Sequence, residues 1–308
     1  MMSSSKRFRI AVPDLISNSY FPAIAATELG KFRDQGLDAE VQLIFPVSKA
    51  YEALRAGEVD CVAGSAHSAL AAFPEWRGVK LLCAQGQGMY WFLVMRSDIK
   101  PARGDVGVVR GRKIGAAPWV DLGLKQLLIA AGLDEARDNI TIAPVPNTGS
   151  PSVNFGLTAA KALEERLIDG FWANGMGTEV AVRSGAGAVV LDIRRGDGPK
   201  ECFNYTMASL AVTDEFLQTR SDDARRAVTA MNETHAALKK DVSLAAQVGR
   251  KVFPEREAAL IEGLIARDLP CYSTKITPEF VTAMNEFARR RGILQGDPDY
   301  SKVVAFAV

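Results

Sequence analysis

The sequence predicts an α/β protein built as two α/β lobes that are joined by a two-strand hinge. Residues 8–84 alternate short apolar strands with amphipathic helices, and residues 112–193 repeat this architecture without repeating the sequence. Two further apolar runs, Tyr90–Arg96 and Tyr205–Val212, are interpreted as strands that cross between the lobes, and the second of them has no local partner. The predicted lobes are residues 1–94 with 206–308, and residues 95–205.

Composition limits the classes of function. The chain has 308 residues, of which 48% are apolar, enough for two hydrophobic cores. Its net charge of +1 provides no strong field to attract nucleic acid or a membrane surface. No apolar run approaches the roughly 18 residues that a membrane-spanning helix needs. We therefore expect a protein whose ligand is a small molecule, rather than one that binds nucleic acid or a membrane.

The first block reads strand, helix, strand, helix, strand, helix, strand. It begins with a strand over Phe8–Val12 and a helix that runs to about Arg33, with apolar residues at helical spacing. A strand over Leu37–Phe45 and a helix that ends at Gly57 follow. The strand Val79–Ala84 completes a largely parallel sheet.

The stretch between Val59 and Leu70 is the most informative part of this block. An apolar strand stops at Gly64, and a helix is predicted to start at Ser65 or Ala66, with Ser65 as its N-cap. His67, one of two histidines in the chain, falls in that first turn. A strand, a glycine turn and a helix start place backbone donors at the carboxyl edge of a sheet, where open α/β folds bind ligands.

The second block repeats the order of the first. The predicted strands are Arg112–Ala116, Asn139–Val145, Gly170–Ala173 and Ala188–Ile193, and the predicted helices are Pro118–Gly132, Thr158–Ile168 and Thr178–Arg183. After Val212 the chain is predicted to be mostly helical, with a long helix capped by Ser221 and helices near Glu255–Ala266 and Pro278–Arg291. His235 lies on the apolar stripe of the long helix, which favours a core or interface histidine over a ligand.

The four cysteines, Cys61, Cys83, Cys202 and Cys271, show no CxxC spacing. Buried free thiols are the favoured interpretation over metal ligands or a disulfide. A bridge between Cys61 and Cys83, if they lie on neighbouring strands of an exported protein, is the alternative.

Four segments resemble a known family. They are Glu28–Val41 (ELGKFRDQGLDAEV), Arg55–Asp60 (RAGEVD), Gly111–Gly115 (GRKIG) and Val212–Leu217 (VTDEFL). Together they are similar to the thiamine-pyrimidine-synthesis and sulfonate–nitrate–taurine (NMT/THI-type) substrate-binding proteins of ABC importers. The resemblance implies the type II periplasmic-binding-protein fold, closure of two lobes on a solute, a periplasmic location and membrane subunits of a transporter as partners.

The family also includes enzymes, and this sequence matches their catalytic and cofactor-binding residues poorly. The lysine that binds pyridoxal phosphate in the pyrimidine-synthase branch falls on Gly64, and its histidine falls on Ser68, one residue beyond His67. The cysteine cluster of that branch falls near Cys202, which stands alone, and the desulfinase cysteine falls on Asn18-Ser19-Tyr20. A solute-binding protein without enzymatic activity, metal or cofactor is favoured. A cytosolic enzyme on the same fold (pyrimidine-synthase-, desulfinase- or decarboxylase-like), with His67 as acid or base, is the alternative.

Five turns are predicted to face a cleft between the lobes. We expect ligand contacts, and no catalytic or metal-binding residue, from Asn18, Ser19, Tyr20, Ser65, Ala66, His67, Gln87, Tyr90, Trp119, Val120, Asn174 and Met176. These turns contain aromatic side chains but no arginine or lysine. They therefore favour a flat, partly apolar ligand, such as a pyrimidine or an aromatic acid, over nitrate or sulfate.

The N-terminal residues give no export signal. Met1–Arg9 is polar and basic, and the apolar run Phe8–Val12 is too short for the core of a signal peptide. The resemblance implies a periplasmic location, whereas a native start at Met1 would imply the cytoplasm. We expect a monomer; the ligand, the compartment and the redox state of Cys61 and Cys83 stay open.

Overall fold

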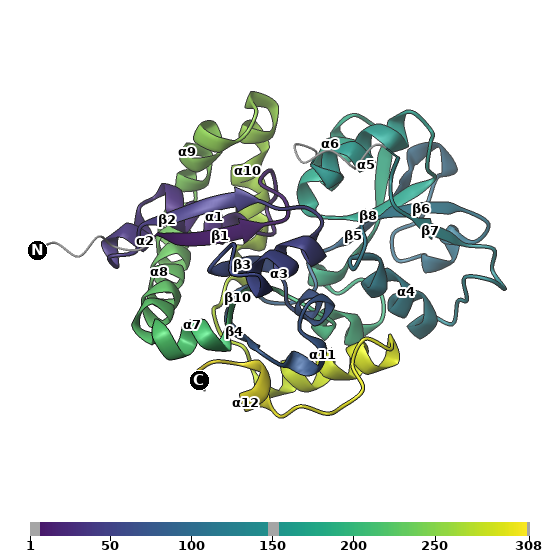
Figure 1. Cartoon of the computed structure of the whole chain (residues 1–308). Helices are drawn as coiled ribbons and strands as arrows, with labels where there is room; N and C mark the ends of the chain where they lie inside the picture. The colour runs from purple at the N-terminus through teal and green to yellow at the C-terminus, as the bar shows by residue number, and fades with distance from the viewer. Residues whose placement is uncertain (1–6, 147–153, 307–308) are drawn as a thin grey trace, which may run out of the picture. The chain divides into compact units, whose positions relative to one another are not determined.

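The computed structural model describes residues 7–146 and 154–306, and Figure 1 shows their helices and strands. The described residues form two compact units. The first takes the chain up to Leu15, Ser19–Gln87 and the chain from Met207 onward, and the second takes Ile16–Asn18 and Gly88–Thr206. Within the described residues, each unit contains one sheet of five strands.

The first sheet has the strand order β2-β1-β3-β10-β4. Its strands are β1 (Phe8–Val12), β2 (Ala39–Leu43), β3 (Cys61–Ser65), β4 (Val79–Gly86) and β10 (Ala208–Thr213). The strands β1, β2 and β3 are parallel, while β10 is antiparallel to both β3 and β4. The carboxyl ends of β1 to β4 and the amino end of β10 therefore meet at one edge, which we call the carboxyl edge of the first sheet.

The helices of the first unit agree with most of the expected positions. They are α1 (Phe21–Glu28), α2 (Lys31–Asp34), α3 (Val47–Arg55), α7 (Asp214–Thr219), α8 (Ser221–Lys240), α9 (Ser243–Val252), α10 (Glu255–Asp268), α11 (Pro278–Arg290) and α12 (Tyr300–Val303). The predicted single helix up to Arg33 is wrong, because Gly30 adopts a left-handed conformation with φ of 75° and separates α1 from α2. The predicted α-helix after Ser65 is a 3-10 helix over Ala66–Ala71.

The second sheet has the order β7-β6-β8-β5-β9. Its strands are β5 (Phe92–Arg96), β6 (Lys113–Ala116), β7 (Thr141–Ala143), β8 (Gly170–Ala173) and β9 (Gly187–Asp192). The strand β5 is antiparallel to its neighbours β8 and β9, which makes it an interior strand of this sheet. The interpretation of Tyr90–Arg96 as a strand that crosses between lobes is therefore wrong, since β5 forms its ladder entirely with strands of the second unit.

The helices of the second unit cover both faces of its sheet. They are α4 (Asp121–Ala130), α5 (Phe155–Glu164) and α6 (Gly175–Arg183). Figure 1 shows α5 and α6 together on one face of β5 and β8, with α4 on the other. A Cβ atom on Gly177 would lie 2.4 Å from the carbonyl oxygen of Gly156, so the two helices approach closely through glycines.

Replacing Gly177 with alanine is expected to lower the free energy of unfolding by about 2 kcal/mol, because the new methyl group collides with backbone that cannot rotate away. Urea titration of the purified chain measures this change. The control is Gly263→Ala in α10, where a Cβ atom meets nothing within 4 Å. The free energy of unfolding of that variant should rise by about 0.5–1 kcal/mol, because alanine has a higher helix propensity than glycine. A Gly177→Ala protein whose free energy of unfolding equals that of the wild type would contradict the close packing of α5 on α6.

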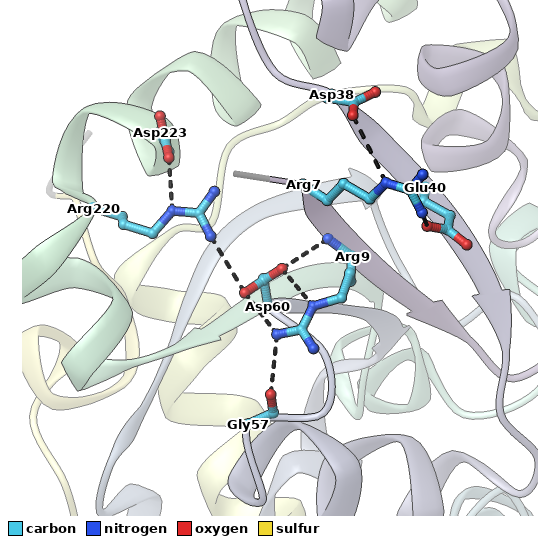
Figure 2. A network of polar contacts seen from close by, with 8 residues as sticks. All are labelled: Arg7, Arg9, Asp38, Glu40, Gly57, Asp60, Arg220 and Asp223. Carbon is cyan, nitrogen blue, oxygen red and sulfur yellow. Dashed lines mark hydrogen bonds and ion pairs between the residues drawn. The ribbon is translucent and has the colours of Figure 1, made fainter. Parts of the chain in front are cut away.

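An ion-pair network holds together the amino ends of β1 and β3 (Figure 2). Oδ2 of Asp60 accepts hydrogen bonds from the backbone N–H of Arg9 at 2.8 Å and from its Nε at 3.0 Å. Oδ1 accepts from Nη2 of Arg9 at 3.1 Å and from Nη1 of Arg220 at 3.3 Å. Burial alone would raise the pKa of Asp60, but the hydrogen bonds and charge of Arg9, with the charge of Arg220, lower it on balance.

Cysteines and histidines lie mostly in the interior. Cys61, Cys83, Cys202 and Cys271 are free thiols, and the first three are buried. The alternative of a Cys61–Cys83 bridge between neighbouring strands is wrong, because β10 lies between β3 and β4. His235 is 5% exposed, as its place on an apolar stripe predicts.

Within the described ranges, no helix combines the length and apolar character that crossing a bilayer requires.

Candidate functional site

Strand register brings separate segments together at the carboxyl edge of the second sheet. Phe92 at the start of β5 pairs with Ala173 at the end of β8 and with Asp192 at the end of β9. Because β5 runs antiparallel to both neighbours, the residues before Phe92 lie beside the residues that follow Ala173 and Asp192. Segments far apart in the sequence therefore share one edge.

Three aromatic side chains form a continuous group there, which we call the aromatic cluster: Tyr90, Trp91 and Trp172. The ring centroids of Tyr90 and Trp91 are 5.1 Å apart, and those of Trp91 and Trp172 are 6.0 Å apart with an edge-on geometry. A Cβ atom on Gly123 would lie 2.9 Å from the Trp91 ring, so this glycine lets α4 pack closely on the cluster. Tyr90 was a predicted contact, whereas Trp91 and Trp172 were not among the selected residues.

Trp119 lies at the same edge, after β6 and before α4. Its φ of 71° places a bulky residue in the left-handed region, which costs of order 1–3 kcal/mol. A strained backbone conformation persists only where the surrounding structure fixes it. Such conformations are concentrated at ligand-binding and catalytic sites. Val120, the N-cap of α4, has ordinary helical geometry and no side-chain cap. Both side chains are partly exposed.

The first turn of α6 is capped by two asparagines. The Oδ1 atom of Asn174 accepts from the backbone N–H of Met176 at 3.0 Å and of Gly177 at 3.3 Å. Oδ1 of Asn18 accepts from the same N–H of Met176 at 3.1 Å. Asn174 directly follows β8 as the N-cap of α6, and its contact with a ligand stays a prediction. Since amide oxygens fill this helix start, the N–H groups of Met176 and Gly177 are not available to a small oxyanion without displacing them.

One cation at this edge was missed by the sequence analysis. Arg194 follows β9, is 9% exposed, and holds its guanidinium carbon 5.7 Å from the centroid of the Tyr90 ring. The adjacent Arg195 instead pairs with Asp192, at 3.4 Å from Nη1 to Oδ1. The strand over Ala188–Ile193 was predicted, and its carboxyl end marks a sixth turn at the sheet edge that was not considered.

The indole N–H of Trp172 is buried and has no hydrogen-bond partner among the described residues. The whole side chain is inaccessible, and it lies one residue before the end of β8. A buried donor without an acceptor costs about 1–3 kcal/mol. A bound water or a ligand acceptor at the aromatic cluster would recover that cost.

The contacts predicted just after β3, at the carboxyl edge of the first sheet, are buried, as is the aromatic cluster, in which Tyr90, Trp91 and Trp172 are at most 3% exposed. His67 is 0% exposed, and its ring packs edge-on against Phe287 of α11 at 5.4 Å. Ser65 does not cap the following 3-10 helix through its side chain; its Oγ lies 2.6 Å from Oγ of Ser68. The backbone N–H of Ala66 donates to the carbonyl of Met207. These bonds hold the first turn of the 3-10 helix Ala66–Ala71 in a buried position. The role of His67 in ligand binding stays a prediction.

The remaining predicted contacts of the first unit are also engaged or buried. The side-chain amide of Gln87 donates to the carbonyls of Ser273 at 3.1 Å and Lys275 at 2.8 Å. Ser19 and Tyr20 are buried, and Tyr20 is the N-cap of α1 without a side-chain cap bond. The structure therefore gathers Asn18, Tyr90, Trp119, Val120, Asn174 and Met176 in the second unit, and leaves the others in the first.

The described residues offer little for thiol or metal chemistry. Burial raises the pKa of Cys61, and it raises the pKa of Cys83 and of Cys202 to about 12, so these thiols stay protonated at neutral pH. Among residues 7–146 and 154–306, no group of three or more histidine, cysteine or acidic side chains is arranged to hold a metal ion. The groups that this edge of the second sheet brings together are aromatic rings and one buried indole donor.

No protein-family model matches the chain, and no curated protein sequence matches it significantly. Solved structures match it over nearly its full length. A protein of Bordetella bronchiseptica RB50 is 21% identical, with a TM-score of 0.76 over 96% of this chain and 92% of that one. The alkanesulfonate-binding protein SsuA of Xanthomonas axonopodis pv. citri, bound to MOPS, is 12% identical, with a TM-score of 0.72 over 98% and 97%.

A third match is the structure of a complex with a small aromatic acid. A mutant of DszB in complex with biphenyl-2-sulfinic acid is 13% identical, with a TM-score of 0.64 over 97% of this chain and 96% of that one. At these identities the similarity shows the fold alone. The chain has the fold of the periplasmic binding proteins, which confirms the predicted fold class.

Proposed function

We propose that this chain is a solute-binding protein of an ABC importer and that it binds a small aromatic or heterocyclic molecule. The observation that carries the proposal is the edge of the second sheet, where the aromatic cluster lies with Trp119 in a strained conformation. Aromatic faces bind flat ligands by offset or edge-on stacking, which contributes about 0.5–1.5 kcal/mol for each ring pair beyond area burial.

The matched structures support a binding role without naming the ligand. Sulfonate-binding and nitrate-binding proteins share the fold, and one of them is described as a putative component of an ABC transporter. Three of these proteins are described as periplasmic. By this similarity the partners of the chain would be the membrane subunits of a transporter, and its compartment would be the periplasm. The chain would act as a monomer that takes up one ligand and needs no cofactor.

A cytosolic enzyme on the same fold (pyrimidine-synthase-, desulfinase- or decarboxylase-like) is the second candidate, since a DszB mutant in complex with biphenyl-2-sulfinic acid shares the fold. An enzyme of this kind needs an activated nucleophile or an accessible acid or base. The raised pKa values of the buried thiols argue against a cysteine nucleophile. His67, the proposed acid or base, is buried against Phe287. These features favour binding over catalysis.

Thermal unfolding against aromatic acids, pyrimidines, sulfonates and inorganic anions tests the proposal. An aromatic ligand at about 100 times its Kd should stabilise the protein by about 2.7 kcal/mol. Trp119→Ala should weaken that ligand at least tenfold, because it removes one stacking surface. The control, Ile129→Ala, truncates a side chain of α4 that is 53% exposed and should bind as wild type does.

Mass spectrometry of the incubated ligand separates the two candidates. Recovery of the ligand unchanged supports a binding protein, and its conversion to product supports the enzyme. Stabilisation by inorganic anions alone, with no effect of any aromatic compound, would contradict the proposed ligand class.

A further inference from the structure

We propose that an open cavity of the first unit binds a small molecule through a phosphate group, and that Arg77, Lys80 and Lys302 hold this group. The cavity lies at the amino edge of the first sheet, by which we mean the edge where β4 begins and β10 ends. This edge is opposite the carboxyl edge of the same sheet, so the proposal does not depend on the proposed function.

Segments that are distant in the sequence form the walls of the cavity. The register of β10 with β4 brings Asp214 beside Gly78, and the backbone N–H of Asp214 donates to the Gly78 carbonyl at 3.0 Å. The helix α12, which carries Lys302, is held beside β4 by a bridge between Leu81 and Val304. The volume of the cavity is about 570 Å³, within the roughly 300–1,000 Å³ that small-molecule sites occupy.

A strained turn, Glu75–Gly78, forms another wall. Glu75 and Trp76 are consecutive residues with φ of 58° and 59°, a left-handed conformation that is strained for residues other than glycine. Oε1 of Glu75 accepts from the backbone N–H of Gln295 at 2.9 Å, and Oε2 accepts from that of Gly296 at 2.8 Å. These bonds fix the turn against the loop that follows α11, so this wall is preorganised for a ligand.

The acidic side chains that line the cavity already have partners in the protein. The two backbone N–H groups that bond to Glu75 are the main reason why its pKa is lowered. Oδ1 of Asp297 pairs with Nη1 of Arg289 at 2.5 Å. Asp214 is the remaining carboxylate, and its charge acts on Lys80. Each acidic group therefore has a positive or N–H group near it, which leaves the other cations of the lining for a ligand.

Two of the three cations in the lining have no bonding partner. Within residues 7–146 and 154–306, the guanidinium of Arg77 and the ammonium of Lys302 make no hydrogen bond and no ion pair, and Arg77 acts on Glu75 only through its charge. Nζ of Lys80 donates to the carbonyl of Ser301 at 2.5 Å, which places it next to the segment of Lys302. Burial lowers the pKa of Lys80, and the positive charge of Lys302 lowers it further, against the opposite effect of the remaining carboxylate. An anion that contacts both ammonium groups would relieve their repulsion.

A phosphate group matches this set of donors better than a carboxylate does. At neutral pH a phosphate monoester carries a charge of about −1.5 to −2 on three acceptor oxygens, so one group can accept from a guanidinium and two ammonium groups. A carboxylate offers a single charge on two oxygens. Arginine binds phosphate through its planar fork and lysine binds it as a point charge, and the lining supplies both kinds of donor. The volume of the cavity also leaves room for an organic portion beside the phosphate.

Calorimetry on the whole chain with matched probes tests the proposal. The probes are inorganic phosphate, glucose 6-phosphate with glucose, and adenosine 5′-monophosphate with adenosine. At least one phosphate probe should bind, and an organic phosphate that binds should do so at least tenfold more tightly than its partner without phosphate. Tightest binding of inorganic phosphate supports a site for the free ion, whereas tighter binding of an organic phosphate supports a site for a phosphate ester.

Variants of two exposed residues assign the binding to this cavity. Arg77→Gln and Lys302→Gln should each weaken the phosphate probe at least fivefold and leave thermal unfolding without ligand unchanged, since both side chains are exposed. The control, Lys240→Gln, removes one charge from the exposed end of α8, outside the cavity lining, and should bind the probe as wild type does. Trp119→Ala, at the edge of the second sheet, should also bind it as wild type does.

Three results would overturn the proposal. They are no binding of any phosphate probe at millimolar concentration, equal binding of the members of each pair, and unchanged affinity in both Arg77→Gln and Lys302→Gln. Each of these results leaves the proposed binding of an aromatic solute untouched. A phosphate probe whose affinity falls in Trp119→Ala but not in the two cavity variants would also overturn the proposal, because the phosphate would then bind at the edge proposed for the solute.

Discussion

Asp60→Asn is expected to lower the free energy of unfolding by about 3 kcal/mol or more. The carboxylate is the shared partner of Arg9 and Arg220, and it is 8% exposed. Asparagine fills the same space but removes the charge, which leaves the guanidinium of Arg9 without this anion in a partly buried site and leaves Arg220 with Asp223 as its carboxylate partner. Breaking one partner of a buried ion pair costs about 3–5 kcal/mol. Urea titration at neutral pH measures the change.

The control uses a surface ion pair of the same sheet. Arg7 and Asp38 approach to 3.9 Å, with side chains that are 68% and 63% exposed, so Asp38→Asn should change stability by less than about 1 kcal/mol. If Asp60→Asn and Asp38→Asn lower the free energy of unfolding by similar amounts, the network in Figure 2 does not join β1 to β3 as strongly as its geometry indicates.

His235 is expected to make the protein acid-sensitive between about pH 6.5 and pH 4. Burial lowers its pKa from 6.5 to about 4, more than the bond to the Gln85 carbonyl raises it. Between these pH values the unfolded chain binds a proton that the folded chain does not, so the free energy of unfolding falls as pH falls. The full contribution is about 3 kcal/mol, reached near pH 4 and constant below it.

His235→Gln isolates this contribution. The carbonyl of Gln85 can only accept, so Nε2 of the histidine donates at 3.0 Å, and a glutamine amide retains a donor at that place. Glutamine does not titrate, so the stability difference between wild type and variant should change by about 3 kcal/mol from pH 7 to pH 4. A difference that stays constant with pH would show that His235 is not held neutral by burial.

The order of helices and strands was predictable because each element carries its own periodicity. Residues 113–146 and 154–192 form strands and helices close to the expected bounds, since short apolar runs between glycine turns mark buried strands. The helix α9 was missed, and the 3-10 helix after Ser65 was expected as an α-helix. In the latter case the backbone N–H of Ala66 bonds to Met207, a partner far away in the sequence.

The pairing of strands was less predictable than their existence. The apolar run that contains β5 was interpreted as a strand that crosses between lobes, whereas its partners β8 and β9 come about 75 or more residues later in the chain. The same difficulty hid Arg194, which reaches the binding edge only through the pairing of Phe92 with Asp192. The strained φ of Trp119 has no sequence signal, although an aromatic residue before a helix start was enough to select it.

The indole signals of the four tryptophans provide the most direct measurement of where a ligand binds. In a ¹⁵N-labelled protein, assigned by single Trp→Phe variants, Trp91, Trp119 and Trp172 report on the carboxyl edge of the second sheet. Trp76 is the internal control, because it lies before the amino end of β4 and donates to Asn285 in the first unit. Titration with a stabilising aromatic probe should shift the signals of Trp119 and the aromatic cluster and leave that of Trp76 in place. A shift of Trp76 alone, or no shift at saturation, would contradict binding at this edge.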